Sequence, residues 1–266
     1  MRPQQKGKVM RRFVDLSVPL EENPSERVPV HMRRMGHSEG ARLMGSLFGV
    51  PVDGLPDALG WASEQLTLVT HAGTHMDAPW HYSPVSCGAR ARTIDEIPLE
   101  WCIGPGVVLD LRFKNHGDAI TVADLAQSLR RIDHQLQPGE IVLLLTGASK
   151  FWGRPDYPER GAGLVAESVM WLCDQGVKII GTDAWGLDPP FGAMRRQFAR
   201  TGDSRVIWSA HFAGREREYC QLEKLTNLDL LPTGGFMVVC FPVKISGGSA
   251  GWVRAVALVS EPARRA

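Results

Sequence analysis

The chain has no apolar run long enough to cross a membrane and no marked excess of charge of either sign. No apolar stretch in its 266 residues approaches the roughly 20 residues that a membrane-spanning helix needs. Its 30 basic and 29 acidic residues give a net charge of +1. We therefore expect neither a membrane nor a nucleic-acid partner, because a basic excess would favour both.

Cysteines are few, and their spacing shows no pairing. The chain has five, an odd number without a CxxC motif: Cys87, Cys102, Cys173, Cys220 and Cys240. This usage is typical of a reduced, cytoplasmic protein. The first residues are basic, but no apolar run follows them, so they do not form a secretory signal. We expect residues 1–12 to be a flexible basic arm.

Internal repeats, low-complexity tracts and linkers are also absent, so we expect one domain over residues 13–266. Short β-branched runs bounded by glycine, proline or aspartate predict strands. They span residues 13–18, 65–70, 106–112, 140–146, 177–182, 205–212, 236–243 and 252–259. With only two clear helices, the pattern predicts an α/β domain that is β-rich and built on a mixed sheet or partial barrel.

The two helices have recognisable ends. Thr121 can cap the first, with Asp124 three residues later and an apolar stripe that continues to Ile132. The second is expected from about Leu164 to Gln175. Gly176 follows it, where a left-handed residue commonly ends a helix.

One segment concentrates metal-binding chemistry. Within HAGTHMDAPWH, four side chains of ligand type fall in eleven residues: His71, His75, Asp77 and His81. Imidazoles and a carboxylate suit Zn²⁺, Mn²⁺ or Fe²⁺. We expect His71 to end a strand, a turn through Gly73, and then an extended segment. Such a segment places two residues spaced two apart on one face.

This segment differs from the helical HExxH zinc motif, because Ala72 stands where that motif has glutamate and Pro79 prevents a helix from passing through it. Two histidines and one carboxylate also form the triad of non-haem iron oxygenases. A metal-binding module without catalysis is a second alternative. His81 lies just beyond the other three, and a neutral imidazole there suits proton transfer in a hydrolase.

Aromatic residues near this segment are candidates for a substrate pocket. Trp61 precedes it, Trp80 lies between the motif residues Pro79 and His81, and Phe48 lies in the apolar, glycine- and proline-rich segment 44–60. Aromatic walls favour a flat, cyclic or conjugated small molecule. A long segment of this kind is often a lid or pocket wall, so we expect it to be an ordered loop or short helix over the pocket.

The same segment resembles the signature of the cyclase family of metal-dependent hydrolases, which includes bacterial kynurenine formamidases, isatin hydrolases and trans-dienelactone hydrolases. The family hallmark HxGTHxDxPxH matches at His71, Gly73, Thr74, His75, Asp77, Pro79 and His81. The resemblance extends to FVDLSVPLEE, IPLEWCIGPGVVLDL and GTDAWGLDPP. His211 and Glu223, twelve residues apart, match a distal histidine and glutamate of the formamidases.

The resemblance implies a swivelling β/β/α-type domain and a divalent metal, Zn²⁺ or Mn²⁺, as one or two ions. It implies that His71, His75 and Asp77 bind one ion, and that Asp77, His211 and Glu223 bind a second or complete the first. It also implies a homodimer or homotetramer. The expected reaction is hydrolysis of a cyclic amide, a lactone or an N-formyl aryl substrate by metal-activated water. An arylformamidase acting on N-formylkynurenine is the alternative, although HAGTH stands where formamidases have HTGAH.

Overall fold

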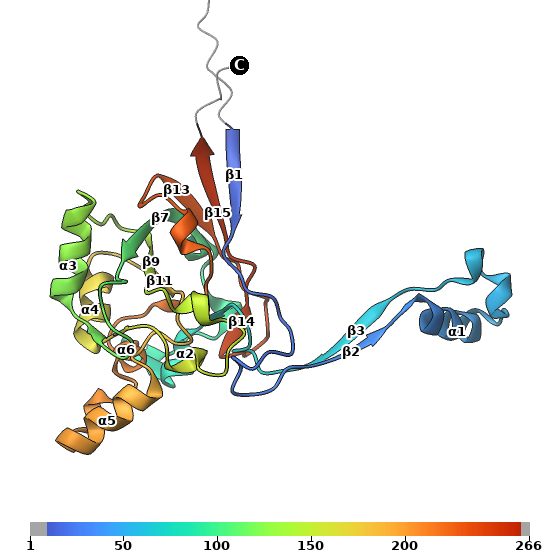
Figure 1. Ribbon diagram of the computed structural model, residues 1–266, viewed down its shortest axis with the longest axis horizontal. Helices are drawn as coiled ribbons and strands as arrows, with labels where there is room; N and C mark the ends of the chain where they lie inside the picture. The colour runs from blue at the N-terminus through green and yellow to red at the C-terminus, as the bar shows by residue number, and fades with distance from the viewer. Residues whose placement is uncertain (1–9, 262–266) are drawn as a thin grey trace, which may run out of the picture.

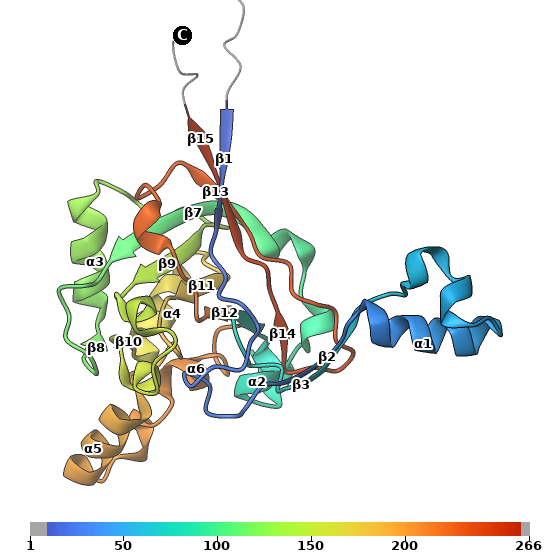
Figure 2. The same ribbon diagram turned by 45° about the vertical axis from the view of Figure 1, so that its right-hand side comes forward.

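The computed structural model describes residues 10–261, and one mixed sheet of nine strands forms its centre (Figure 1). In spatial order the strands are β1 (Met10–Asp15), β15 (Val256–Glu261), β13 (Phe236–Val239), β7 (Ile103–Asp110), β9 (Ile141–Leu145), β11 (Ile179–Thr182), β12 (Cys220–Glu223), β4 (His75–Asp77) and β14 (Ala250–Trp252). Strands β7, β9, β11 and β12 are parallel, and the other neighbours are antiparallel. The sheet curls into a half-barrel (Figure 2), which confirms the predicted fold class.

The middle strands are buried on both faces. All five residues of β9 are buried, and its sequence IVLLL lacks the polar alternation of a half-exposed strand. Ile141, Leu143 and Leu145 pack into one apolar cluster, whereas Val142 and Leu144 pack into the cluster on the opposite face. This alternation follows from the two-residue period of a strand. The sheet therefore separates two cores.

Two helices cover the second of these cores, and both agree with the sequence prediction. They are α3 (Val122–Arg131) and α4 (Ala166–Asp174). At the start of α3 the Asp124 amide donates to Thr121 Oγ1 at 3.3 Å, and the Thr121 amide donates to Asp124 Oδ2 at 2.8 Å. Gly176 has φ of +86° just beyond α4, as its position predicted.

The remaining elements are short or lie outside the sheet. They are α1 (His37–Phe48), α2 (Pro79–Tyr82), α5 (Phe191–Thr201), α6 (Ser209–Ala213), β2 (His31–Met35), β3 (Ser63–Thr67), β5 (Val85–Ser86), β6 (Ala89–Arg90), β8 (Ala119–Ile120), β10 (Gly163–Leu164) and the 3-10 turns Val52–Gly54, Pro56–Ala58, Ile94–Glu96, Leu99–Cys102, Ala148–Phe151, Tyr157–Glu159, Ser204–Val206 and Leu228–Leu230. None of the helices among residues 10–261 is long and apolar enough to cross a membrane.

Two strand predictions need correction. Residues 205–212 are not a strand: a 3-10 turn is followed by α6, because the Asp188 carboxylate accepts the backbone N–H groups of Ala210 and His211 and so caps this helix from a distant loop. Residues 252–259 are two strands, since β14 ends at Trp252 and β15 begins at Val256. β13 nevertheless pairs antiparallel with β15.

Segment 44–60 is not a loop over the body of the protein. Strands β2 and β3 form a separate hairpin that carries α1 and two 3-10 turns away from the sheet (Figures 1 and 2). The end of this arm closes on itself: a Cβ on Gly40 would lie 1.8 Å from the Trp61 carbonyl oxygen, so only glycine allows the approach. We call residues 31–67 the arm.

The predicted N-terminal basic arm lies outside the described residues up to position 9. Residues 10–12 belong to β1, where they pair with residues 259–261.

Candidate metal centre

The HAGTHMDAPWH segment adopts a turn, a short strand and one turn of helix. β3 ends at Thr67, so His71 does not end a strand as predicted but lies in the turn that follows. Gly73 has φ of +61°, and a Cβ there would lie 2.7 Å from Leu20 Cδ2. β4 then buries His75 and Asp77 on one face, as predicted, and α2 begins at Pro79.

Strand pairing brings the distal glutamate to this segment. β4 runs antiparallel to β12 with His75 opposite Glu223. Their closest side-chain atoms, His75 Nε2 and Glu223 Oε2, are 3.5 Å apart. This contact depends on sheet order, since 148 positions separate the two residues along the chain.

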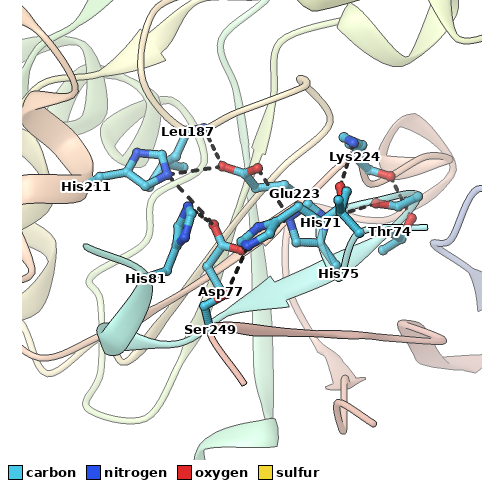
Figure 3. Close-up of polar contacts among 12 residues, drawn as sticks. His71, Thr74, His75, Asp77, His81, Leu187, His211, Glu223, Lys224 and Ser249 are labelled. Carbon is cyan, nitrogen blue, oxygen red and sulfur yellow. Dashed lines mark hydrogen bonds and ion pairs between the residues drawn. The ribbon is translucent and has the colours of Figure 1, made fainter. Parts of the chain in front are cut away.

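Four imidazoles surround Asp77 (Figure 3). Asp77 Oδ1 lies 2.9 Å from His71 Nδ1 and 3.1 Å from His75 Nε2. On the other side, Asp77 Oδ2 lies 3.8 Å from His81 Nε2 and 3.7 Å from His211 Nε2. His211 Nε2 is also 3.7 Å from Glu223 Oε1. The structure therefore brings together the five residues predicted as metal ligands and His81, the predicted proton carrier.

Several of these atoms are buried without a hydrogen-bond partner. His75 Nδ1 contacts the Gly73 carbonyl at 2.9 Å, which fixes the ring so that Nε2 faces the site. That Nε2 and both oxygens of Asp77 make no hydrogen bond within the described residues. Buried polar atoms normally have partners. A divalent cation would satisfy all three, so the donor set fits a metal of the zinc or manganese type.

Among residues 10–261, two groups of ligand atoms lie close enough to hold an ion, and both include Asp77. One is His75, Asp77 and Glu223, and the other is His71, Asp77 and His81. Within each group the donor atoms lie within 4.8 Å of one another. Geometry alone thus allows His81 to be a ligand as well as a proton carrier.

His211 is positioned by a residue that sequence reasoning missed. Its Nδ1 hydrogen-bonds Asp188 Oδ2, and the same carboxylate caps α6, which carries the histidine. The ring also stacks on Trp208, with centroids 4.3 Å apart. Asp188 belongs to the GTDAWGLDPP segment noted above. The sequence therefore pointed to this segment but did not indicate that Asp188 orients His211.

The ionisation of the site follows from burial and close charges. Burial would raise the pKa of Asp77, but the surrounding imidazoles outweigh burial and hold it well below the usual range. Burial, reinforced by the Asp77 charge, raises the pKa of Glu223. Burial would lower the pKa of His211, yet its hydrogen bond to Asp188 and the nearby Asp77 carboxylate raise it to about 10. Metal binding at His211 would therefore release a proton.

His81 differs from the other imidazoles. Burial is the largest influence on it and lowers its pKa to about 4. The ring is consequently neutral at pH 7 and able to accept a proton. Its centroid lies 4.1 Å from that of His71 and 5.6 Å from that of His211.

A buried ion pair holds the turn that carries His71. Lys224 Nζ donates to Glu26 Oε2 at 2.6 Å and to the His71 carbonyl at 2.8 Å. Glu26 Oε1 accepts the Gly73 amide at 2.7 Å, and Thr74 Oγ1 donates to the Lys224 carbonyl at 2.6 Å. Lys224 is only 1% exposed. Sequence reasoning missed both ends of this pair, and nothing in the local pattern connects residues 26 and 224.

A cavity of about 210 Å³ opens beside the candidate ligands. Trp185, Phe191 and Trp208 contribute aromatic walls, and its polar lining includes His71, His81, His211, Glu223 and Arg160. The structure does not bring Phe48, Trp61 or Trp80 to this cavity. The first two lie on the arm, and Trp80 is 41% exposed on the outer side of α2. Trp185 lies within the GTDAWGLDPP motif and Phe191 follows it directly, while Trp208 stands three residues before His211. Their closeness to these two resemblances was the available signal.

Known proteins resemble this chain in sequence and structure. A family profile described as "Putative cyclase" matches residues 14–189. The kynurenine formamidase of Erythrobacter litoralis is 33% identical over 192 residues, which are 72% of this chain and 74% of the relative. The isatin hydrolase of Roseibium aggregatum is 27% identical over 212 residues, 73% of each chain. Isatin hydrolase A from Ralstonia solanacearum superposes with a TM-score of 0.74 at 25% identity, covering 94% of this chain and 92% of that one.

Proposed function

Because the chain belongs to the cyclase family, we propose that it is a metal-dependent hydrolase that uses activated water on a cyclic amide, a lactone or an N-formyl aryl compound. The observation that carries this proposal is the set of buried atoms without partners, His75 Nε2 and both oxygens of Asp77. The kynurenine formamidase and isatin hydrolase relatives support the same reaction class.

The proposed ligands divide into two overlapping sets. His71, His75 and Asp77 would hold one ion of Zn²⁺ or Mn²⁺. Asp77, His211 and Glu223 would hold a second ion or complete the shell of the first. The distances of 2.9–3.7 Å between Asp77 oxygens and these imidazoles support this assignment. The short separation of His81 from Asp77 Oδ2, 3.8 Å, makes His81 the residue whose role most needs testing.

When bound, a divalent cation would lower the pKa of a water molecule towards about 7 and polarise a substrate carbonyl. The protein would supply proton transfer and positioning. His81, neutral at pH 7, would take a proton from the attacking water and pass it to the departing nitrogen or oxygen. Asp188 would keep the His211 ring oriented towards the site.

The cavity suggests the size and type of substrate. Its lining combines aromatic rings with the candidate metal ligands, a combination suited to a flat ring that presents a carbonyl to the metal residues. A ring-opening substrate of the isatin type is our first choice, since similarity to isatin hydrolase A covers 94% of this chain. N-formylkynurenine is the alternative, favoured by the formamidase relatives.

The test uses protein stripped of metal and reloaded with Zn²⁺ or Mn²⁺. Isatin, a dienelactone, N-formylkynurenine and a simple aryl ester would be assayed in parallel, with Asp77→Asn as the matched variant that removes the shared ligand charge. Metal-restored turnover of any substrate, lost in Asp77→Asn, would establish a metal-dependent hydrolase. Stoichiometric metal without turnover of any ester or amide would instead indicate a binding module.

We further propose that the protein is a homodimer. Large apolar side chains on the arm are exposed in the single chain, including Leu47 at 68% and Phe48 at 62%. Exposed apolar patches of this kind usually mark a protein interface. Sedimentation of the purified chain would test this, and a monomer at micromolar concentration would refute it.

A further inference from the structure

Two basic side chains line the cavity beside the candidate metal centre, and their charges are balanced differently. They are Arg160 and Lys224. Lys224 is buried and has its own carboxylate partner, Glu26. Arg160 pairs with Asp156, but Asp156 also accepts hydrogen bonds from Arg154 at 3.0 and 3.1 Å. Because two guanidinium groups share one carboxylate, one positive charge is left over.

The acidic side chains of the lining do not balance this charge. They are Asp188 and Glu223. Asp188 hydrogen-bonds His211, and Glu223 lies 3.7 Å from the same ring, so both carboxylates belong to the candidate metal centre. Arg27, which lies over two of the aromatic walls, pairs with Glu159 at 2.7 Å. Among the described residues that line the cavity, the unbalanced positive charge therefore lies at Arg160.

The position of Arg160 is fixed by its surroundings. Its amide donates to the Tyr157 carbonyl at 2.9 Å, where the 3-10 turn Tyr157–Glu159 ends. Its Cζ atom lies 4.2 Å from the centroid of the Phe151 ring, which supports the plane of the guanidinium group. A side chain held in this way loses little further freedom when it binds a ligand.

Most of the hydrogen-bonding capacity of this guanidinium group is unused. An arginine carries five N–H donors in a planar fork. Within residues 10–261 the Arg160 side chain makes one hydrogen bond, from Nη2 to Asp156. The side chain is 30% exposed, so its remaining donors are open to a ligand in the cavity. A planar fork of this kind matches the two oxygens of a carboxylate.

We propose that Arg160 binds an acidic group of the substrate. The cavity would then select a cyclic or aromatic compound that carries a carboxylate in addition to the carbonyl that is hydrolysed. This inference rests on the proposed function and specifies the substrate class of the same site. The candidate metal residues act on the carbonyl, and Arg160, which lines the same cavity, holds the acidic group.

The acidic group takes no part in bond breaking. Water supplies its oxygen to the carbonyl carbon, and the departing nitrogen or oxygen receives the proton, while the carboxylate stays on Arg160. The contact is therefore equally strong before and during the reaction. An interaction of this kind lowers KM and leaves kcat unchanged.

Matched substrates that differ only by a ring carboxylate test the proposal. The metal-loaded protein would be assayed with isatin against its ring carboxylates, and with formanilide against meta- and para-formamidobenzoate. Arg160→Gln should raise KM for the preferred carboxylate by about 10–100-fold, because a hydrogen bond to a charged group is lost. KM for the neutral member of each pair and kcat for both members should not change.

Two further variants separate charge from shape. Arg160→Lys keeps the charge without the planar fork, so it should recover part of the lost affinity for the carboxylate. Arg90→Gln removes an exposed arginine that pairs with Glu96 outside the cavity lining, and it should leave every KM unchanged. Circular dichroism and metal content would verify that each variant is folded and loaded.

Calorimetric titration with benzoate and benzamide gives a measurement that does not depend on turnover. Wild type should bind benzoate more tightly than benzamide, and Arg160→Gln should remove the difference. Benzoate binding that survives in Arg160→Gln would place the carboxylate elsewhere, on the metal for example, and would overturn the inference. An equal rise in KM for charged and neutral substrates would also overturn it. Arg160-dependent benzoate binding without turnover of any substrate would refute the proposed hydrolase and support the anion contact.

Discussion

Replacing Lys224 by methionine should destabilise the protein and weaken metal binding together. Methionine has nearly the same length as lysine but no charge. The change leaves Glu26, whose side chain is only 4% exposed, as a buried carboxylate with the Gly73 amide as its remaining hydrogen-bond donor. It also removes the donor at 2.8 Å from the His71 carbonyl. One substitution thus strands a buried charge and releases the turn that carries a proposed ligand.

The expected loss of stability follows from the burial of the pair. Removing one partner of a buried ion pair costs about 3–5 kcal/mol. An unfolding entropy of about 2.1 cal/mol/K per residue gives about 0.56 kcal/mol/K for 266 residues, so Tm should fall by roughly 5–9 °C. The double variant Glu26→Gln/Lys224→Met should regain most of this loss, since no buried charge then lacks a partner.

The expected loss of metal affinity comes from the freed turn. Residues that orient metal ligands typically contribute about 10–100-fold to metal affinity. Calorimetric melting of metal-free protein would measure stability, and titration against a chelating dye would measure the dissociation constant of Zn²⁺. Arg254→Met is the control. It breaks a surface ion pair in which the Arg254 side chain is 76% exposed and that of Asp15 is 42% exposed, so it should shift Tm by less than about 2 °C. A Tm change as small as the control's in Lys224→Met would refute the stability argument. A large change with unaltered Zn²⁺ affinity would show that the pair stabilises the fold without positioning His71.

Four further substitutions test other parts of the structure. His75→Ala removes a fully buried imidazole that is a proposed metal ligand, so it should abolish metal binding, measured as zinc content after dialysis. His81→Ala should retain zinc but lose turnover by about 10²–10⁴-fold if the residue carries the proton, whereas loss of zinc would make it a ligand. Thr121→Ala should cost about 1 kcal/mol in denaturant unfolding. Burial would raise the pKa of Asp124, but its hydrogen bonds to Thr121 and Lys114 lower it. The contribution of the ionised Asp124 carboxylate to capping is therefore present at neutral pH and disappears as the pH falls below about 4. Gly163→Ala would place a Cβ 2.0 Å from the Asp188 carbonyl carbon, so it should displace the partner of His211 and weaken zinc binding, while Gly234→Ala, with no atom within 4 Å, should not.

Local sequence patterns succeeded where a few neighbouring residues determine the structure. The Thr121 capping box and Gly176 mark the ends of their helices because both signals act within one helical turn. The spacing of His75 and Asp77 required one shared face, and β4 provides it. These features depend on nearest neighbours along the chain.

Patterns failed where a distant residue decides the outcome. Residues 205–212 resemble a strand, yet Asp188 caps α6 there from another loop. Segment 44–60 is apolar and near the motif in sequence, yet the β2–β3 hairpin carries it away from the cavity. Trp80 lies between two motif residues, but successive residues of a helical turn point in different directions, and only His81 faces the site.

The sequence by itself determined the chemistry of the candidate centre, because the ligand types and their spacing in HAGTHMDAPWH restrict the reaction and the local backbone. Tertiary structure decided how that centre is completed. The order of strands placed Glu223 beside His75, a capping contact placed His211 opposite Asp77, and a buried Lys224–Glu26 pair fixed the turn. Each of these contacts joins segments far apart along the chain, and only the burial of the whole sheet brings such segments together.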